Sequence, residues 1–192
     1  MLKQLGPAFR MTLVMTALTG LIYPGVVTGL CQLLFHHRAN GSLIYVNGQE
    51  IGSTLIAQGF TKPEYFHPRP SVAGNGYDPT ASGGSNYGPT NQKLIDRMKA
   101  SIDAFRKENP DYKGPIPADL VTTSASGLDP DLSPASAEAQ AARVAKARGV
   151  SLDQVRQLID QGTEGPTLGF IGEPRVNVLK LNLRLDQRFP RR

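Results

Sequence analysis

An uncharged and largely apolar run near the N-terminus constrains this chain most. Between Arg10 and His36 the sequence contains no charged residue. As a helix rising about 1.5 Å per residue, residues 11–35 could cross a hydrocarbon core of about 30 Å. A cleaved signal peptide has a shorter apolar core followed by small residues, and a soluble core helix rarely stays uncharged for so long. The run therefore predicts a transmembrane helix over 11–35, preceded by a short N-terminal segment, residues 1–10.

Three residues of this predicted span indicate that it packs against other helices. Gly25 and Gly29 form a GxxxG pattern, which lets a second helix approach closely. Gln32 places a polar side chain inside the apolar run, and Pro24 removes a backbone donor. We expect Gly25, Gly29 and Gln32 to be helix-packing positions.

The charges around the run indicate its orientation. Lys3 and Arg10 precede it, and Arg38 follows it at once. Because cytoplasmic flanks of a span are enriched in Lys and Arg, this balance favours a cytoplasmic N-terminus. Residues 36–192 would then form one soluble domain on the opposite side, which is the periplasm in a bacterium with two membranes.

Few residues outside the run could carry catalysis or bind a metal. Cys31 is the only cysteine and lies within the run, so no disulfide and no cysteine-based metal site is expected. His36 and His37 lie at the predicted membrane boundary, which leaves His67 as the only histidine in the body of the domain. We expect no metal, no tightly bound cofactor and no Ser-His-Asp triad. The net charge of +5 comes without a long basic run, which argues against a nucleic-acid surface.

The first half of the domain reads as a hairpin followed by loops. Asn47-Gly48 lies between apolar stretches and is the preferred pair for a tight type I′ turn. Residues 62–71 contain three prolines and are expected to be extended or irregular. Residues 72–90 are rich in Gly, Ser, Asn and Pro and predict a long loop, and loops of this length are usually functional or mobile.

The second half of the domain predicts helices and a last strand. Helical periodicity begins near Thr90 and ends near Asn109, and Ser133 and Ser151 are typical caps of two further helices. Residues 175–186 alternate as in a strand, with a change of phase between Val178 and Leu179 that predicts a bulge. We expect an α+β domain in which this last strand joins the first hairpin.

The segment Ser82-Gly-Gly-Ser-Asn86 lies in the long loop before the first of these helices. Free backbone donors at such a turn can bind an anion, although the full phosphate-loop pattern Gly-x4-Gly-Lys-Ser/Thr is missing. The segment also looks like a fragment of the ABC-ATPase signature, while the simpler interpretation is a structural turn. The candidate nucleotide-binding residues are Ser82, Gly83, Gly84, Ser85 and Asn86.

Other polar residues are candidates for interactions within the domain or with a partner. Arg69 beside Ser71 could hold a carboxylate or phosphate, or close an internal salt bridge. Asp129 could act with Asp131 as an acid–base pair, or both could be solvated. The remaining candidates are Gln140 and Arg143, which share a helix face and are solvated or intradomain, and Glu173 and Arg175, a candidate ion pair at the last loop.

Several motifs taken together in this order resemble the C subunit of the Kdp potassium-transporting ATPase. The resemblance covers nearly the whole chain and begins with the single N-terminal span. The motifs are Gly52-Ser-x-Leu-Ile-x-Gln-x-Phe60, Tyr65-Phe-His67, Arg69-Pro-Ser71, Ser82-Gly-Gly-Ser-Asn86, Asp129-Pro-x-Leu-Ser-Pro134, Gln140 with Arg143-Val-Ala, and Gly172-Glu-Pro-Arg-Val-Asn-Val-Leu179.

The resemblance implies a non-catalytic subunit of a high-affinity, ATP-driven potassium uptake complex in a bacterial inner membrane. The implied partners are a channel-like potassium-binding subunit, a P-type ATPase subunit and a small single-span subunit. The chain lacks the Asp-Lys-Thr-Gly-Thr motif that P-type pumps phosphorylate. Roles implied for it are assembly, stability and action as a catalytic chaperone that raises the pump's ATP affinity, with ATP reached through the partner subunit.

A second interpretation is a free-standing, membrane-anchored domain that binds or hydrolyses envelope material. The scarcity of histidine and the absence of cysteine from the domain weigh against a hydrolase. Purification in mild detergent separates the two interpretations, because a subunit migrates with large multispan proteins and a free-standing domain migrates alone.

Overall fold

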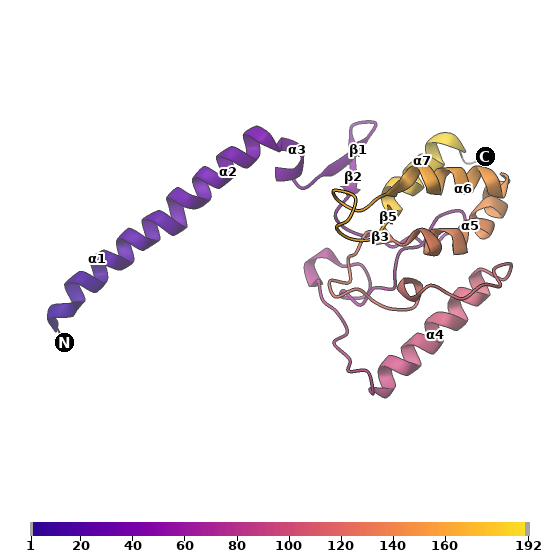
Figure 1. Ribbon diagram of the computed structural model, residues 1–192, viewed down its shortest axis with the longest axis horizontal. Helices are drawn as coiled ribbons and strands as arrows, with labels where there is room; N and C mark the ends of the chain where they lie inside the picture. Colours follow the sequence, from indigo (N-terminus) through magenta and orange to yellow (C-terminus); the bar gives the residue numbers. More distant parts are fainter. Residues whose placement is uncertain (1, 191–192) are drawn as a thin grey trace. The chain divides into compact units, whose positions relative to one another are not determined.

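The computed structural model describes residues 2–190 and separates the chain into two compact units, one ending at Ser53 and one beginning at Thr54 (Figure 1). The α+β class predicted from the sequence is confirmed. The helices are η1 (Leu2–Gln4), α1 (Leu5–Met15), η2 (Thr16–Ile22), α2 (Tyr23–Leu34), α3 (His36–Ala39), η3 (Pro79–Ala81), α4 (Gln92–Glu108), η4 (Ala118–Leu120), α5 (Pro134–Arg148), α6 (Leu152–Gly162) and α7 (Val178–Arg188). The strands are β1 (Leu43–Val46), β2 (Gln49–Ser53), β3 (Asp131–Leu132), β4 (Thr163–Glu164) and β5 (Arg175–Asn177).

The first unit is dominated by a continuous helix over Leu2–Leu34. Among the described residues it is the one helix long and apolar enough to cross a membrane. Its middle part, Thr16–Ile22, is π-helical, and the Tyr23 amide donates to the Leu18 carbonyl five residues back. Pro24 follows directly and has no amide hydrogen to donate, so the widened turns lie where a regular α-helical ladder is interrupted.

The predicted hairpin is present in the first unit. β1 and β2 pair antiparallel around Asn47 and Gly48, whose φ angles are 52° and 78°. Positive φ at both central positions is what a type I′ turn requires, and Asn-Gly tolerates it best. The register shifts once, between Ile44 and Tyr45.

The helices predicted for the second unit form at the expected caps. The Ser133 side chain accepts from the Ser136 amide at the start of α5, and α5 ends at Gly149, which has a left-handed φ of 65°. Ser151 and Gln154 form a reciprocal capping box at the start of α6. These caps satisfy backbone groups that a helix end otherwise leaves without partners.

The prediction of a long last strand over 175–186 is wrong. Only Arg175–Asn177 is extended, and Val178–Arg188 is the helix α7. The Asn177 side chain accepts from the Lys180 amide and caps this helix. The Leu-rich segment fits period two, but Val178, Leu181 and Leu185 also recur at helical spacing and are buried together.

The last strand also pairs differently from the expectation. β5 lies between β3 and β4 in a three-stranded antiparallel sheet, whereas β1 and β2 form a sheet of their own. The expected pairing of the last strand with the hairpin is therefore wrong. The three residues of β5 pair with β3 and β4, which both belong to the second unit, and the helix α7 follows directly.

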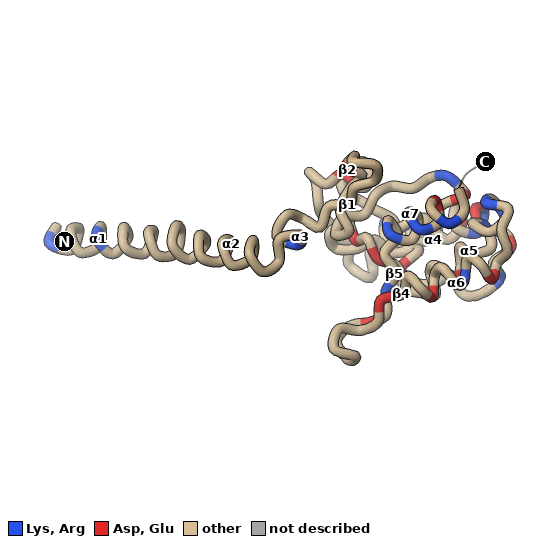
Figure 2. Tube along the Cα trace, turned by 90° about the horizontal axis from the view of Figure 1, so that it is seen from above, with Lys and Arg blue, Asp and Glu red and all other residues tan. Residues whose placement is uncertain are grey.

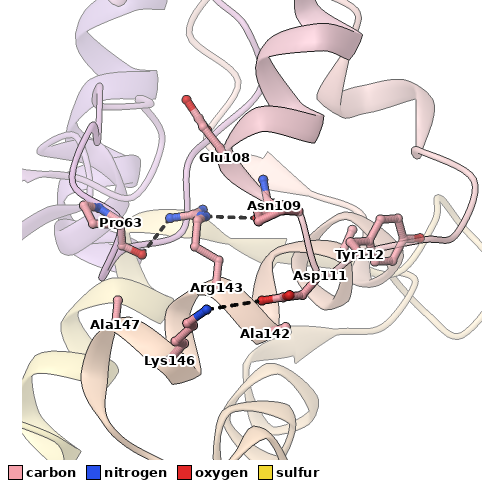
Figure 3. A pocket seen from close by; sticks show the side chains of 11 residues that line it. Pro63, Glu108, Asn109, Asp111, Tyr112, Ala142, Arg143, Lys146 and Ala147 are labelled. Atoms are coloured by element: carbon pink, nitrogen blue, oxygen red, sulfur yellow. Dashed lines mark hydrogen bonds and ion pairs between the residues drawn. The ribbon is translucent and has the colours of Figure 1, made fainter.

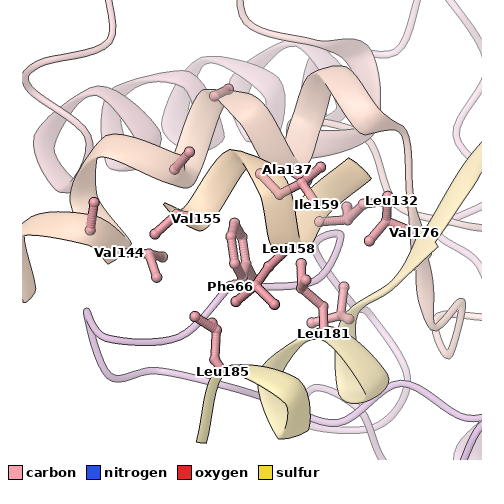
Figure 4. Close-up of a cluster of buried hydrophobic side chains, with 14 of the residues drawn as sticks. Phe66, Leu132, Ala137, Val144, Val155, Leu158, Ile159, Val176, Leu181 and Leu185 are labelled. Atoms are coloured by element: carbon pink, nitrogen blue, oxygen red, sulfur yellow. The ribbon is translucent and has the colours of Figure 1, made fainter. Parts of the chain in front are cut away.

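The core of the second unit lies between α5, α6 and α7 (Figure 4). Small side chains of α5, among them Ala137 and Ala141, are fully enclosed and let α6 approach closely. Phe66 comes from an extended segment rather than from a helix and is fully buried. It lies among Leu158, Leu181, Leu185, Val144 and Val155 (Figure 4).

Candidate functional site

The extended segment that carries Phe66 is held by side chains of α5 and α7. Gln140 of α5 accepts from the His67 amide at 2.8 Å and donates to the His67 carbonyl at 3.0 Å. Asn182 of α7 makes the same pair of bonds with Phe66, both at 2.9 Å. Each side-chain amide therefore bonds to the backbone N–H and C=O of one residue, as a neighbouring strand would. These bonds satisfy the backbone of Phe66 and His67, which lie in no strand of the structure.

Arg143 extends this network along α5. Its guanidinium donates to the carbonyls of Pro63 and Tyr65 at 2.7 and 2.9 Å and to Asn109 Oδ1 at 3.0 Å. It also donates to Gln140 Oε1 at 2.7 Å. The sequence left open whether Gln140 and Arg143 are solvated or bond within the domain. Both are buried and bond within the domain. Because these donors are engaged internally, the pair holds backbone in place and has little capacity left for an external anion.

A small cavity of about 200 Å³ opens beside Arg143 (Figure 3). Arg143 bonds to Asn109 and Pro63 on one side, and Lys146 lies 3.8 Å from Asp111 on the other. The remaining lining is mainly apolar and includes Ala142 and Tyr112. The cavity therefore has charged groups on two sides with apolar walls between them, and the Arg143 guanidinium already makes four hydrogen bonds to oxygens of the protein.

His67 lies at the edge of the same network. Its Nδ1 is 3.2 Å from Glu108 Oε2, and its Nε2 is 3.0 Å from the Lys62 carbonyl oxygen. Burial, reinforced by the nearby Arg143 cation, lowers the pKa of His67 below its ordinary value of 6.5, although Glu108 opposes the shift. The ring therefore belongs to the packing of the 62–71 segment.

A second polar cluster joins the loop after Phe66 to the loop before α5. Arg69 forms an ion pair with Asp129 at 2.8 Å, so the alternative of an internal salt bridge is the one observed. The Ser71 hydroxyl donates to the Gly127 carbonyl at 2.6 Å and accepts from the Tyr77 amide at 2.9 Å. Burial raises the pKa of Tyr77 to about 12. Arg69, Ser71 and Asp129 thus fasten two long loops to each other.

The Gly-rich segment Ser82–Asn86 lies on this loop pair. The Gly83 amide and the Ser82 hydroxyl both bond to the Ser126 carbonyl, at 2.9 and 3.0 Å. The helix α4 begins only at Gln92, where Asn91 caps it, so the segment does not form the helix start. A methyl group added at Gly84 would lie 2.9 Å from the Ala125 carbonyl oxygen, whereas one at Gly83 would meet open space.

Glu173 and Arg175 do not pair with each other. Arg175 lies 3.3 Å from Asp131 and 3.4 Å from Glu164, and Glu164 is also 2.9 Å from Lys180. Hydrogen bonding from Lys180 is the main cause that lowers the pKa of Glu164, whereas burial raises the pKa of Asp131. Glu173 is exposed, and among residues 2–190 it has no ion-pair partner.

The helix-packing candidates lie on the long helix of the first unit. Gly25 and Gly29 face open space, since an added Cβ would meet no atom within 4 Å. The Gln32 side chain exchanges hydrogen bonds with Asn40, at 3.2 Å in both directions. Gln32 thus has a partner near the end of the helix, and the two glycines leave a flat strip on its surface.

Sequence reasoning missed the residues that tie the ends of the second unit together. Arg148 is nearly enclosed, lies 2.8 Å from Asp186 and covers the ring of Tyr65 at 4.9 Å. Asn182 was hidden because its segment was taken for a strand. A polar residue inside a Leu-rich run was a usable signal, since a buried amide has to find partners. Residues 2–190 hold no group of three or more His, Cys, Asp or Glu side chains placed to bind a metal.

Comparison with known proteins gives a match over nearly the whole chain. The family model described as "KdpC: K+-transporting ATPase, c chain" matches residues 5–187. A protein of Myxococcus xanthus named potassium-transporting ATPase KdpC subunit is 60% identical over 95% of this chain and 87% of its own length. Proteins with the same name from Caulobacter sp. strain K31 and Rhodospirillum rubrum are 59% and 56% identical, each over 99% of this chain and over 96% and 98% of their own lengths.

Proposed function

Because this chain belongs to the KdpC family of potassium-transporting ATPase c chains, we propose that it is an accessory, non-catalytic subunit that assembles and stabilises an ATP-driven potassium uptake complex. The match of the family model over residues 5–187 carries the proposal, because it covers both the long helix and the second unit. The subunit would be anchored in the bacterial inner membrane by the helix Leu2–Leu34 and would contact its partners through that helix and through its domain.

The surface of the long helix supports an anchoring role. None of its most apolar stretch is buried within the chain, so its side chains are available to lipid or to other helices. Gly25 and Gly29 leave room for a second helix at close distance. We propose that this strip packs against a span of the channel-like or the P-type subunit, and that the small single-span subunit completes the complex.

The domain is proposed to face the periplasm. Lys3 and Arg10 at the start of the helix favour a cytoplasmic N-terminus under the positive-inside rule. Arg143 and Gln140 bond mainly to groups within the domain, and Arg69 is paired with Asp129. These internal contacts support a structural domain that presents its outer surface to partners, rather than one that processes a substrate.

A second prediction is that the segment Ser82–Asn86 contacts ATP and raises the ATP affinity of the P-type subunit. It stays a separate prediction. The Gly83 side of the loop is open, which supports an approach to its surface. Against it, the loop has no helix start behind it, and a periplasmic domain would meet little ATP. Assembly is therefore the role that we propose first.

Co-purification of the intact complex tests the proposal. The Gly25→Ile/Gly29→Ile variant fills the strip, and Gly6→Ile adds one such side chain elsewhere on the helix, where an added Cβ also meets no atom within 4 Å. We expect the double variant to lower recovery of multispan partners in mild detergent by about tenfold, and Gly6→Ile to leave it unchanged. A wild-type chain that purifies alone, free of any multispan protein, would overturn the proposal.

A further inference from the structure

The loop between β4 and β5 forms a protruding structure, here called the apolar finger and defined as Gly165–Gly172. β4 and β5 pair antiparallel at its base, with Glu164 opposite Arg175. Figure 2 shows the loop extending away from the body of its unit, with charged residues at its base and none along its length. The finger is thus an exposed element with an uncharged tip.

The tip displays large apolar side chains to solvent. Leu168 is 79% exposed, Phe170 is 78% exposed and Ile171 is 51% exposed. Single exposed apolar residues are common on soluble proteins, but three within four consecutive positions of a projecting loop form a patch. Such a patch indicates a surface that another molecule covers.

The finger is a folded hairpin. The amides of Thr167 and Ile171 each donate to the other's carbonyl, at 2.8 and 2.9 Å, and the Gly169 amide donates to Pro166 at 3.0 Å. These bonds satisfy the amides of Thr167, Gly169 and Ile171, so docking of the finger desolvates fewer unpaired polar groups than docking of an unstructured loop would. Its shape exists before any partner binds, which lowers the entropy cost of docking.

The identity of the turn residue Leu168 indicates that its side chain has a function. Leu168 has a φ of 56° and Gly169 a φ of 83°, as in a type I′ turn. Asn or Asp fits the first of these positions better than a branched apolar residue does. Turn formation alone therefore does not account for leucine at this position.

The charges around the finger select the kind of partner. The segment from residue 157 to residue 174 contains Asp160, Glu164 and Glu173 and no Lys or Arg. The nearest cation in sequence, Arg175, already lies within ion-pair distance of Asp131 and Glu164. A loop that inserts into an anionic lipid surface is favoured by free Lys or Arg beside its apolar residues, and here the free group is the Glu173 carboxylate. Because Glu164 is already paired with Arg175 and Lys180, it is the exposed Glu173 carboxylate that favours a protein surface with basic groups.

We propose that the apolar finger inserts into an apolar pocket, bordered by Lys or Arg, on a neighbouring protein subunit of the same complex. This inference rests on the proposed function and assigns it a docking element. Leu168 and Phe170 would fill the pocket, and Glu173 would pair with its basic rim. Interfaces of this form concentrate their affinity in a few buried apolar anchors surrounded by polar groups.

Photo-crosslinking in the assembled complex tests the inference. A benzophenone amino acid replaces Phe170 in the full chain within its native membrane, and the crosslinked product is identified by mass spectrometry. We expect a covalent product with another protein subunit, and we expect Glu173→Lys to lower its yield by about tenfold, the size typical of an interface hot spot. Asp153→Lys is the matched control, since this side chain is 92% exposed on α6 outside the finger, and it should leave the yield unchanged.

The outcomes separate this inference from the proposed function. Products with lipid alone, or no product while the subunits still co-purify, would overturn the finger as a protein contact and leave the accessory role intact. Failure of the wild-type chain to co-purify would overturn the accessory role itself. A Leu168→Asn/Phe170→Ser variant checks the fold, because Asn suits the turn, so its melting temperature should match wild type while its recovery of partners falls.

Discussion

The Asn182 side chain of α7 forms two hydrogen bonds with the backbone of Phe66, one to its amide and one to its carbonyl, each of 2.9 Å. The two residues are 116 positions apart in the chain, and both are buried. This contact, together with the bonds from Gln140 and Arg143, fixes the last helix and α5 against an extended segment from the start of the second unit.

Removal of this amide should destabilise the protein strongly. Asn182→Ala leaves the amide and carbonyl of Phe66 buried without partners, at a cost of about 1–3 kcal/mol per group. We expect the free energy of unfolding, measured by urea titration of the full chain in detergent, to fall by about 2–4 kcal/mol. Gln187→Ala, on an exposed position of the same helix, is the control and should change it by less than about 0.5 kcal/mol. Equal stability of the two variants would contradict the bridging role.

Two glycines with nearly the same backbone angle should differ in their tolerance of alanine. Gly127 and Gly149 have φ angles of 68° and 65°, but an added Cβ lies 2.9 Å from atoms of Ala73 and Gly83 only at Gly127. Gly149→Ala should therefore cost about 1 kcal/mol of left-handed strain, and Gly127→Ala should cost a further 1–3 kcal/mol, approximately, for the forced shift of the loops. Thermal unfolding of both variants measures the difference, and a smaller loss at Gly127 would show that the loop pair is loosely packed.

Stability should rise with pH through the titration of His67. Its pKa in the folded protein lies below 6.5, whereas in the unfolded chain it takes its ordinary value. Between these two pKa values the unfolded state binds more protons, so the contribution is complete above 6.5 and is lost as the pH falls through the window. Urea unfolding at pH 7.5 and at pH 5.5 should show this loss in wild type and less of it in His67→Gln. An identical pH dependence in both proteins would contradict it.

The prediction of a nucleotide contact at Ser82–Asn86 has a clean test at Gly83. A methyl group there meets no atom within 4 Å, so Gly83→Ala keeps the loop folded and changes only its outer surface. If the loop contacts ATP, the apparent KM for ATP of the assembled pump should rise while kcat and assembly stay unchanged. An unchanged KM would remove the contact. Gly84→Ala is unsuitable for this purpose because of its clash with the Ala125 carbonyl.

Local signals in the sequence were enough to predict much of the fold. Asn47-Gly48 tolerates the positive φ angles of a tight turn, and Ser133 and Ser151 cap nearby backbone amides. The turn and helices that these residues predict are all present. The final segment was misread because a short Leu-rich run fits both a strand and a helix, and burial against Phe66 and α6 decides between them. That contact is long-range, so periodicity alone could not supply it.

The candidate site was predictable in residue type and much less so in arrangement. Arg69, Asp129, Gln140 and Arg143 were identified as polar residues of interest. Apart from the bond between Arg143 and Gln140, the partners that hold them in the network lie 34 to 80 positions away in the chain. The sequence does not say which backbone group such a side chain binds, since any residue can supply that group. The apolar finger could not be predicted from the sequence, because exposure of Leu168 and Phe170 is a property of the folded chain.

The π-helical stretch Thr16–Ile22 has a consequence for how the long helix can meet its neighbours. Wider turns change the angular phase of every side chain beyond them, so residues before and after the stretch do not continue one straight stripe. The strip at Gly25 and Gly29 is therefore directed independently of the apolar residues near Met11. One helix with two surfaces that face different directions can contact two different subunits at two depths in the membrane. This suits a subunit that holds a multi-subunit complex together.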